Sequence, residues 1–374
     1  MPRYQLPSVA DLIELGRQHQ HAITVYAQTA PGADHRENNL LTVKSAVDRA
    51  LRTVRESGAS RAVETQLRQH WDRIAGSDLW GNLSRSLAIF IADDVHEVYV
   101  LPNALETQLQ VGQYFDIGQL VRAVTTPQEA YALTLSADGW NLWHATASSR
   151  AEEMTLGGEY AADAAEATNR ATIRGRGQLG RLVGDEGKKT LLETYAKRVA
   201  DAVDSELGQA DPDRAQDLFL FATDPLLDLY RNLDHKRRVV AVPGAPDELR
   251  PDQIDDAIRK ALPKINAERV NSRLEEIGDA VSRGLVASDI ADIARAAVAG
   301  AVSTLVYNFT VDVLGLMNDA TGEVDYTPEG YDLLSRIAVT VLDKGGRVVA
   351  VRNDEISAGI WNGTAIAKLR FALS

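Results

Sequence analysis

The chain has 374 residues, and its composition of 45% hydrophobic and 25% charged residues is typical of globular proteins and excludes a disordered or fibrous chain. Its 40 Lys and Arg against 53 Asp and Glu give a net charge of −13, which argues against a protein that coats nucleic acid over its whole surface. The absence of cysteine excludes disulfides, thiolate metal sites and thiol catalysis.

The sequence also lacks the patterns of membrane insertion. No apolar run reaches about 18 residues, and the N-terminal stretch has no apolar run behind a basic one, as a signal peptide would. We therefore expect a cytoplasmic protein without a membrane partner. At roughly 100–200 residues per domain, the length predicts two or three domains, all of the α/β class.

The first 126 residues alternate between helical and strand patterns. Ser8 has the position of an N-cap before a short helical period, and longer helical periods follow over residues 40–54 and 63–74. Strands are expected where apolar residues alternate or run without a break, over residues 21–28, 87–92 and 95–101. We predict a small α/β domain over residues 1–126.

The next part of the chain begins with a hairpin, because two strand patterns over residues 130–146 flank an Ala-Asp-Gly turn. Residues 147–187 have no apolar period, and so long an insertion is usually functional or disordered. Helical and strand patterns then resume as a helix over 192–207, strands over 217–223 and 238–242, and a helix from 254 toward 277. These elements predict a second α/β domain over residues 127–280.

The last part of the chain alternates helix and strand with short connections. The expected elements are a helix over 290–298, a strand over 304–309, a helix over 329–342, and strands over 347–351 and 365–373. This order predicts a third domain over residues 281–374, with a mixed or parallel sheet covered on both faces.

A basic segment stands out inside the long insertion. Residues 168–198 contain three acids and eight basic residues, so this segment carries +5 while the rest of the chain carries −18. The basic residues are Arg170, Arg174, Arg176, Arg181, Lys188, Lys189, Lys197 and Arg198. A positive arm on an anionic body suits docking onto phosphates, although a basic loop that is merely solvated has the same composition.

Three glycines in this segment, Gly175, Gly177 and Gly180, spell G-x-G-x-x-G. In a dinucleotide site that motif follows a buried strand and opens a helix. The residues before it are rich in Ala, Thr and Arg and form no strand pattern. We therefore predict no nucleotide cofactor, and read the glycines as allowing close backbone approach to a ligand.

The residues around these glycines carry a family resemblance. The sequence Gly-Arg-Gly-Gln at 175–178, with the helix through 195–199, resembles the glycine-glycine-glutamine loop and following helix of archaeal and eukaryotic class-1 peptide release factors. The hairpin at 130–146 resembles the first two strands of the same domain, and residues 345–371 resemble the end of the release factor and Pelota C-terminal domain. Over 127–374 the chain is similar to bacterial archaeo-eukaryotic release factor-like proteins, which include Balon-type ribosome hibernation factors.

This resemblance implies a decoding-site-like domain over residues 1–126 and a middle domain with an RNase H-like fold and an inserted basic loop. It implies a C-terminal domain built as a helix-strand-helix sandwich, like kink-turn-binding ribosomal proteins. In the family, the glutamine loop enters the peptidyl-transferase centre and positions water against the ester between peptide and tRNA. The resemblance thus assigns Gln178 and Gly177 as catalytic residues if the protein hydrolyses that ester, since backbone N–H groups on a glycine turn suit an oxyanion.

The chain departs from the family at Arg176, which stands where the first glycine of the triplet is expected. A side chain there restricts the backbone or crowds the tRNA end, whereas a shifted Gly175–Gln178 turn still presents Gln178. An added arginine favours contacts with RNA phosphates and bases. We therefore predict a non-catalytic ribosome-binding factor, with peptidyl-tRNA hydrolysis as the alternative.

The predicted partners are ribosomal RNA and the P-site tRNA, with a translational GTPase as a further candidate. A second basic cluster beside the strand at 238–242 adds to the predicted RNA-contacting residues, which are Arg170, Arg174, Arg176, Arg181, Lys188, Lys189, Arg237 and Arg238. A third hypothesis is a stand-alone RNase H-like nuclease, which would need carboxylates converging on Mg²⁺. No metal site is predicted, because His19 and His21 share a strand face without a third ligand.

Overall fold

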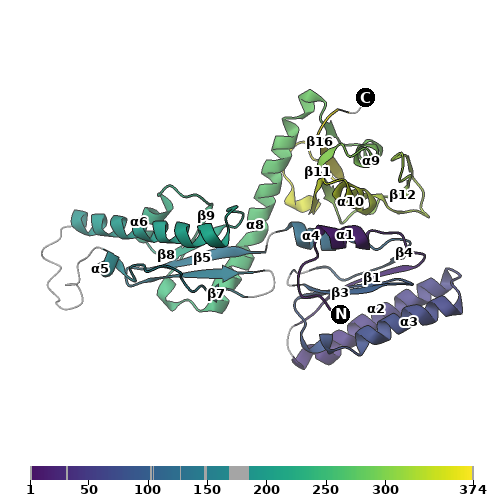
Figure 1. The fold of residues 1–374 in the computed structure, drawn as a ribbon, viewed down its shortest axis with the longest axis horizontal. Coiled ribbons are helices and arrows are strands. Elements are labelled where there is room, and N and C mark those ends of the chain that lie inside the picture. The colour runs from purple at the N-terminus through teal and green to yellow at the C-terminus, as the bar shows by residue number, and fades with distance from the viewer. Residues whose placement is uncertain are drawn as a thin grey trace. The chain divides into compact units, whose positions relative to one another are not determined.

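The computed structural model forms two compact units: unit 1 contains residues 1–126 and 264–374, and unit 2 contains residues 127–263 (Figure 1). The residues it describes are 2–30, 33–101, 103, 105–126, 128–146, 150–167 and 185–372. The first unit boundary lies at 126/127, where the sequence places a domain boundary. The second lies inside a helix at 263/264 and not at 280/281, and the two terminal domains of the prediction share one unit.

The N-terminal part of unit 1 is a four-stranded antiparallel sheet in the order β3-β2-β1-β4. Its strands are β1 (Ala22–Gln28), β2 (Ser86–Ile91), β3 (His96–Leu101) and β4 (Gln108–Gly112). Two long helices, α2 (Arg36–Glu56) and α3 (Arg61–Ala75), cover one face of this sheet (Figure 1). The predicted strands and helices of this part are confirmed, and β4 was not predicted.

Capping and apolar spacing explain why these helices form. Ser8 and Asp11 make a capping box at the start of α1 (Val9–Leu15), and the Ser60 side chain accepts the Val63 N–H at the start of α3. On α2, Val43, Val47 and Val54 follow a helical period and are buried against the sheet. The capping prediction for Ser8 is therefore confirmed.

The C-terminal part of unit 1 has a second sheet in the order β10-β16-β11-β15. The β11 and β15 strands are parallel and the other pairs are antiparallel, which confirms a mixed sheet. The elements are β10 (Val286–Ala287), α9 (Ile290–Val298), β11 (Val302–Asn308), α10 (Leu333–Asp343), β15 (Arg347–Val351) and β16 (Ala365–Leu369). A small sheet of β12 (Leu314–Met317), β13 (Val324–Asp325) and β14 (Tyr331–Asp332) was not predicted.

The two parts of unit 1 are joined by one hydrophobic core. Tyr26 and Phe90, on the face of the N-terminal sheet opposite α2, belong to the same cluster as Ile337 and Leu305 of the C-terminal part. The α4 helix (Gly118–Thr125) contributes Arg122, whose guanidinium donates to the Ala350 carbonyl at 2.9 Å and pairs with Glu355. This shared core is the physical reason why the terminal parts form one unit.

A partly buried carboxylate lies beside this core. Asp116 accepts hydrogen bonds from the Gly118 N–H at 2.9 Å and the Gln108 side-chain amide at 2.5 Å. Burial raises the pKa of Asp116 to about 6, although these hydrogen bonds favour the charged form. The folded chain therefore holds this proton more tightly than the unfolded chain, in which the pKa is near 4.

This pKa shift predicts a specific pH dependence for unit 1. Because the folded state binds the extra proton between about pH 4 and pH 6, the Asp116 contribution to the free energy of unfolding rises by about 2 kcal/mol as the pH falls from 7 to about 4.5. Denaturant unfolding of the wild type and of Asp116→Asn at both pH values tests this. The difference between the two proteins should change by that amount, and a constant difference would contradict the prediction.

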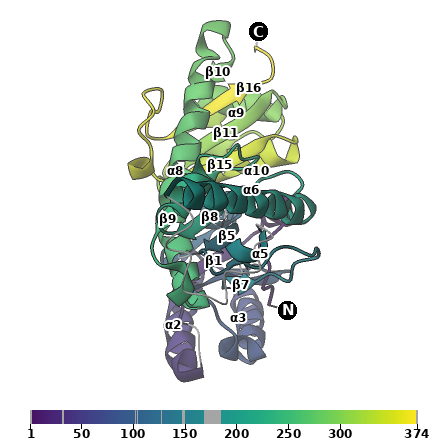
Figure 2. The same cartoon turned by 90° about the vertical axis from the view of Figure 1, so that its left-hand side faces the viewer.

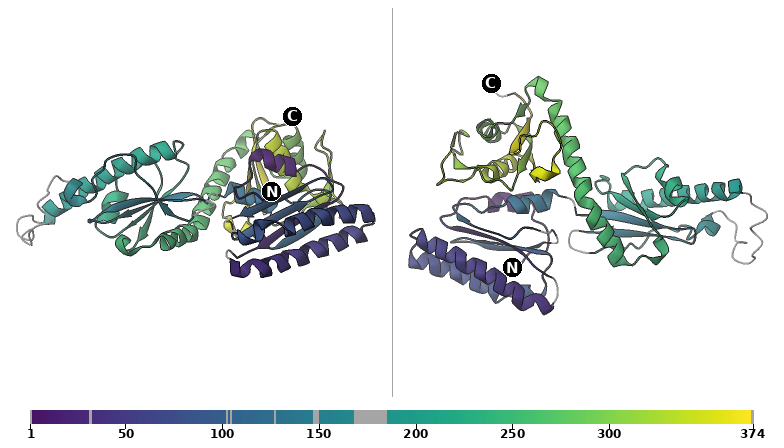
Figure 3. Two further views of the ribbon diagram at one scale, coloured as in Figure 1. Left: turned by 60° about the horizontal axis from the view of Figure 1, so that its bottom comes forward. Right: turned by 180° about the vertical axis from the view of Figure 1, so that it is seen from behind.

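Unit 2 is a mixed five-stranded sheet in the order β7-β6-β5-β8-β9, with helices on both faces (Figures 2 and 3). The strands are β5 (Ala130–Leu135), β6 (Trp140–Ala145), β7 (Glu152–Glu153), β8 (Leu218–Ala222) and β9 (Val239–Pro243). The helices are α5 (Ala164–Ala167), α6 (Asp185–Ala210), α7 (Leu226–Arg231) and the first part of α8 (Pro251–Gly278). The predicted hairpin, strands and long helices of this unit are confirmed.

One core cluster of unit 2 lies between the sheet and α6. Tyr131, Leu133 and Leu135 alternate on one face of β5 and contact the buried Tyr195 and Val199 of α6. This packing fixes α6 lengthwise on the sheet, as Figure 2 shows. Within the described ranges, no helix of either unit combines the length and apolar character needed to cross a bilayer.

Candidate functional site

In the sequence, the predicted glutamine loop lies between α5 and α6 of unit 2. Residues 168–184 lie outside the described residues, so the structure gives no position for Gln178, Gly177 or four of the predicted RNA-contacting arginines, Arg170, Arg174, Arg176 and Arg181. The described chain ends in α5 before this stretch and resumes with α6 after it, and α5 contacts α6. The candidate site is therefore built from the base that carries this stretch.

The segment before α5, residues 150–163, is termed the strap. It is part of the insertion with no apolar period, yet it is held on the sheet by specific hydrogen bonds. The Met154 N–H donates to the Leu142 carbonyl at 2.7 Å, and the Trp140 indole N–H donates to the Ala161 carbonyl at 3.0 Å. Met154 and Ala161 also pack against the core of unit 2. The strap thus attaches the base of the insertion to the hairpin.

A single carboxylate of α6 fastens the middle of the strap. Glu206 accepts the backbone N–H groups of Gly157 at 3.1 Å and Gly158 at 3.0 Å, and the Tyr160 hydroxyl donates to it at 2.8 Å. The hydrogen bond from the Gly157 N–H is the main cause of a lowered pKa of Glu206. The charged carboxylate therefore holds three donors of the strap against the helix.

The basic residues that the structure does describe are partly on the surface of this base. Lys189, in the first turns of α6, is exposed, as are Lys197 and Arg198 further along the helix. Lys188 lies in α6, and its side chain is outside the described part. Lys189 and Lys197 are eight residues apart, so they lie on one face of α6 with Glu193 between them. This face presents cations after the end of the predicted loop in the sequence.

Arg237 and Arg238, the second predicted basic pair, differ in their exposure to solvent. Arg238 is exposed, but the side chain of Arg237 is only 3% exposed and pairs with Asp211 at 2.8 Å. Its guanidinium also donates to the Gln216 carbonyl at 3.2 Å and lies over the Tyr131 ring. The prediction that Arg237 contacts RNA is therefore corrected, because a phosphate cannot reach this buried group. Two adjacent arginines before a strand give no sequence signal for which one points inward.

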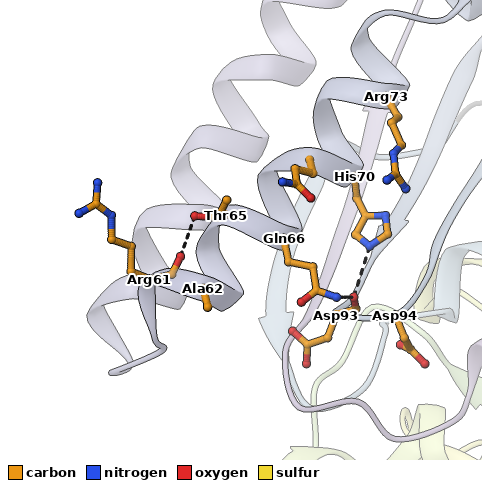
Figure 4. Close-up of a pocket in the computed structure, with 9 residues that line it drawn as sticks. Arg61, Ala62, Thr65, Gln66, His70, Arg73, Asp93 and Asp94 are labelled. Carbon is orange, nitrogen blue, oxygen red and sulfur yellow. Dashed lines mark hydrogen bonds between the residues drawn. The ribbon is translucent and has the colours of Figure 1, made fainter.

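A second polar site, which the sequence did not indicate, lies on α3 (Figure 4). A groove of about 720 Å³ runs along this helix between Arg61 and Arg73, and the turn between β2 and β3 forms its other side. The side chains of Gln66 and His70 both contact the main-chain carbonyl of Asp93 at that turn. The polar side of an amphipathic helix is the only signal for this groove in the sequence.

Histidines concentrate next to this groove. The His70 and His96 Nδ1 atoms are 2.8 Å apart, so one ring donates and the other accepts. Burial, with the neighbouring His70, lowers the pKa of His96. His19 lies 3.3 Å from Asp94, and His21 lies 3.5 Å from Asp93. Among the described residues, no group of three or more His, Asp or Glu side chains is arranged to hold a metal ion.

Comparison with known proteins gives one family match. The family described as "Bacterial archaeo-eukaryotic release factor family 3" matches residues 131–301, a stretch that runs from β5 to the end of the first loop after α9. No curated protein matches the chain. The matched stretch contains the strap, the predicted loop and α6.

The solved structures to which the chain is similar at low identity include the following three. The archaeal translation termination factor aRF1 is 12% identical over 98% of this chain and 99% of that chain, with a TM-score of 0.24. Saccharomyces cerevisiae Dom34 is 13% identical over 76% of this chain and 74% of its own, with a TM-score of 0.37. Archaeoglobus fulgidus Pelota is 15% identical over 77% and 80%, with a TM-score of 0.35.

Proposed function

Because the model of the bacterial archaeo-eukaryotic release factor family 3 matches residues 131–301, we propose that the chain is a release factor-like translation factor that binds the ribosome. It occupies the tRNA A site and acts in hibernation, protection or rescue. Its loop around Gln178 faces the peptidyl-transferase centre and the P-site tRNA. The exposed cations of the base, Lys189 and Arg238, contact ribosomal RNA, and a translational GTPase is a candidate delivery partner.

The observation that carries this proposal is the anchored base of the basic segment. A segment of charge +5 is carried on a chain whose remainder has a charge of −18, and the strap and Glu206 fix its base to unit 2. Ribosomal RNA presents dense phosphate charge, which attracts such an arm while the anionic body resists nonspecific coating. A fixed base lowers the entropic cost of binding, because fewer residues must become ordered when the arm binds.

The residue types favour binding over hydrolysis. Arg176 occupies the position of a family glycine, so the turn that would present backbone N–H groups to an oxyanion is altered there. The same arginine adds a phosphate-binding and base-stacking group. The proposed role is therefore to fill the peptidyl-transferase site, with peptidyl-tRNA hydrolysis as the second candidate function.

A peptide release assay separates these two functions. Purified ribosomes carrying labelled peptidyl-tRNA are incubated with the wild type and with Gln178→Ala, and co-sedimentation with ribosomes is measured in parallel. We expect both proteins to co-sediment and neither to release peptide above the rate without protein. Release by the wild type that falls at least about tenfold in Gln178→Ala would establish the hydrolase instead.

The matched control is Gln209→Ala, since Gln209 is exposed on α6 of the same unit. It should behave as the wild type in both measurements. A wild type that stays in the supernatant at low and moderate salt would contradict the proposed function as a whole. A nuclease function has no support in the described residues, which contain no set of carboxylates and histidines arranged for a metal.

A further inference from the structure

An exposed apolar patch lies on the small sheet of β12, β13 and β14 in unit 1. Among the described residues nine large hydrophobic side chains are exposed, and four of them fall within residues 311–326. Leu314 is 42% exposed, Leu316 46%, Tyr326 56% and Val311 38%. We call residues 311–332 the β12 face. In Figure 1 β12 lies at the outer edge of the C-terminal part of unit 1.

The strand pattern explains why these leucines point outward. Along β12, Leu314 and Leu316 are exposed while Gly315 and Met317 are buried, so one face of the strand packs on α10 and the other is left free. Leu316 is paired with Asp325 of β13, and directly opposed residues of antiparallel strands share a face. An apolar side chain and a carboxylate therefore stand next to each other on the free face.

The charge of the β12 face has one sign. Residues 311–332 contain six acidic residues and no Lys, Arg or His. Asp319 pairs with Arg336 at 2.8 Å, and Asp332 caps α10 by accepting backbone N–H groups. The remaining four carboxylates, Asp312, Glu323, Asp325 and Glu329, are exposed. Asp325 therefore lies beside Leu316, and the other three exposed carboxylates lie in the same segment of the chain.

The backbone of this face is fixed. Gly322 has a φ of +74°, and a Cβ atom there would lie 2.6 Å from the Arg295 Cα, so the turn after β12 fits closely against α9. The Asn318 side chain accepts the N–H groups of Ala320 and Thr321 in the same turn. Next to this turn, the N–H of Met317, the last residue of β12, donates to the Tyr331 hydroxyl at 2.8 Å. A partner would meet a preformed surface, which lowers the ordering cost of binding.

From this patch we infer that the β12 face binds a ribosomal protein whose surface presents apolar side chains within a basic rim. The inference rests on the proposed ribosome binding and names the component that this face contacts. Exposed leucines supply the apolar centre of an interface, and the four carboxylates complement Lys and Arg around it. Ribosomal RNA does not fit, because its phosphates are repelled by the four exposed carboxylates of this face.

Site-specific crosslinking tests this contact. A benzoylphenylalanine replaces Leu316, whose exposure leaves room for it, and the protein is irradiated with purified ribosomes. The inference predicts crosslinks to a ribosomal protein at a basic surface. Crosslinks to ribosomal RNA or to a second copy of the chain overturn it, as does the absence of crosslinks in a protein that co-sediments with ribosomes.

Two variants measure the apolar and charged contributions separately. Leu314→Ser with Leu316→Ser removes the apolar centre, and Asp312→Asn with Glu323→Gln and Asp325→Asn removes three of the four exposed negative charges. Each should weaken ribosome binding by about tenfold, and only the second should reduce its salt dependence. Val281→Ser, at another exposed apolar residue of unit 1, is the control and should bind as the wild type.

The outcomes also separate this inference from the proposed function. If the wild type fails to co-sediment with ribosomes, the proposed function fails and this inference fails with it. If the wild type co-sediments but both variants bind equally well, the β12 face does not contribute and only this inference is overturned. Circular dichroism of each variant verifies that the exposed substitutions leave the fold intact.

Discussion

Replacement of Asp211 by alanine is expected to destabilise unit 2 by about 3–5 kcal/mol, the largest effect predicted for a single substitution in this unit. Asp211 pairs with the buried guanidinium of Arg237 and accepts the backbone N–H groups of Ala215 and Gln216, both at 3.1 Å. Its loss leaves a cation inside the protein without a counter-charge. It also releases the turn between α6 and β8.

The shifted pKa of Asp211 makes the stability difference between the wild type and Asp211→Ala depend on pH. Burial acts to raise this pKa, but the Gln216 N–H and the Arg237 guanidinium outweigh burial and lower it. A carboxylate with a lowered pKa stabilises the folded state above its unfolded pKa of about 4, and this stabilisation is lost as the pH falls further. Acid should therefore weaken the wild type more than Asp211→Ala.

Hydrogen–deuterium exchange of the peptides that contain β5, β8 and β9 measures the stability of unit 2 separately from unit 1. The control is Asp228→Ala, which removes the exposed Asp228–Arg231 pair and should cost under about 1 kcal/mol. The double variant Asp211→Ala with Arg237→Met should recover part of the loss, because no buried charge then remains. Equal exchange in Asp211→Ala and Asp228→Ala would contradict the prediction.

The elements of this fold that could be predicted are those with strong local patterns. The hairpin around Ala-Asp-Gly and the strands at 87–92, 217–223 and 347–351 are recognisable because unbroken or alternating apolar residues have few other conformations to adopt. The long helices could be found from their apolar period. By contrast, β12 to β14 are only two to four residues long, so tertiary contacts and not local pattern determine them.

The packing of the N-terminal and C-terminal parts into one unit could not be predicted from local sequence pattern. In β1, residues from Ala22 to Ala27 are all buried, so both faces of the strand are covered. That unbroken burial means a second layer, but the sequence does not say that α10 and β11, over 200 residues away, provide it. The predicted boundary at 280/281 was placed by pattern alone, whereas contacts divide the chain within α8.

The candidate site shows the same limit at the level of single residues. The basic composition of 168–198 could be counted, and the exposed Lys189 and Arg238 agree with a surface role. The burial of Arg237 and the Glu206 contacts to Gly157 and Gly158 depend on partners distant in the chain. Composition therefore identifies where cations gather, and only the fold identifies which of them are available to RNA.

Replacement of the four loop arginines, Arg170, Arg174, Arg176 and Arg181, by alanine is expected to lower ribosome affinity on the order of 100-fold at moderate salt. Each arginine that contacts a phosphate releases counterions on binding. The loss of four such contacts should therefore reduce the slope of log affinity against log salt by about 3. Filter binding or sedimentation across a salt series measures both quantities.

A charge-matched control distinguishes loop contacts from a general effect of net charge. It replaces four exposed arginines that already pair with carboxylates, namely Arg17, Arg231, Arg250 and Arg295. Both quadruple variants have a net charge of −17, from −13 less four positive charges. The control should lose under about threefold in affinity, because paired exposed cations contribute little beyond net charge. An equal loss in both variants would mean that overall charge, and not the loop, brings the protein to the ribosome.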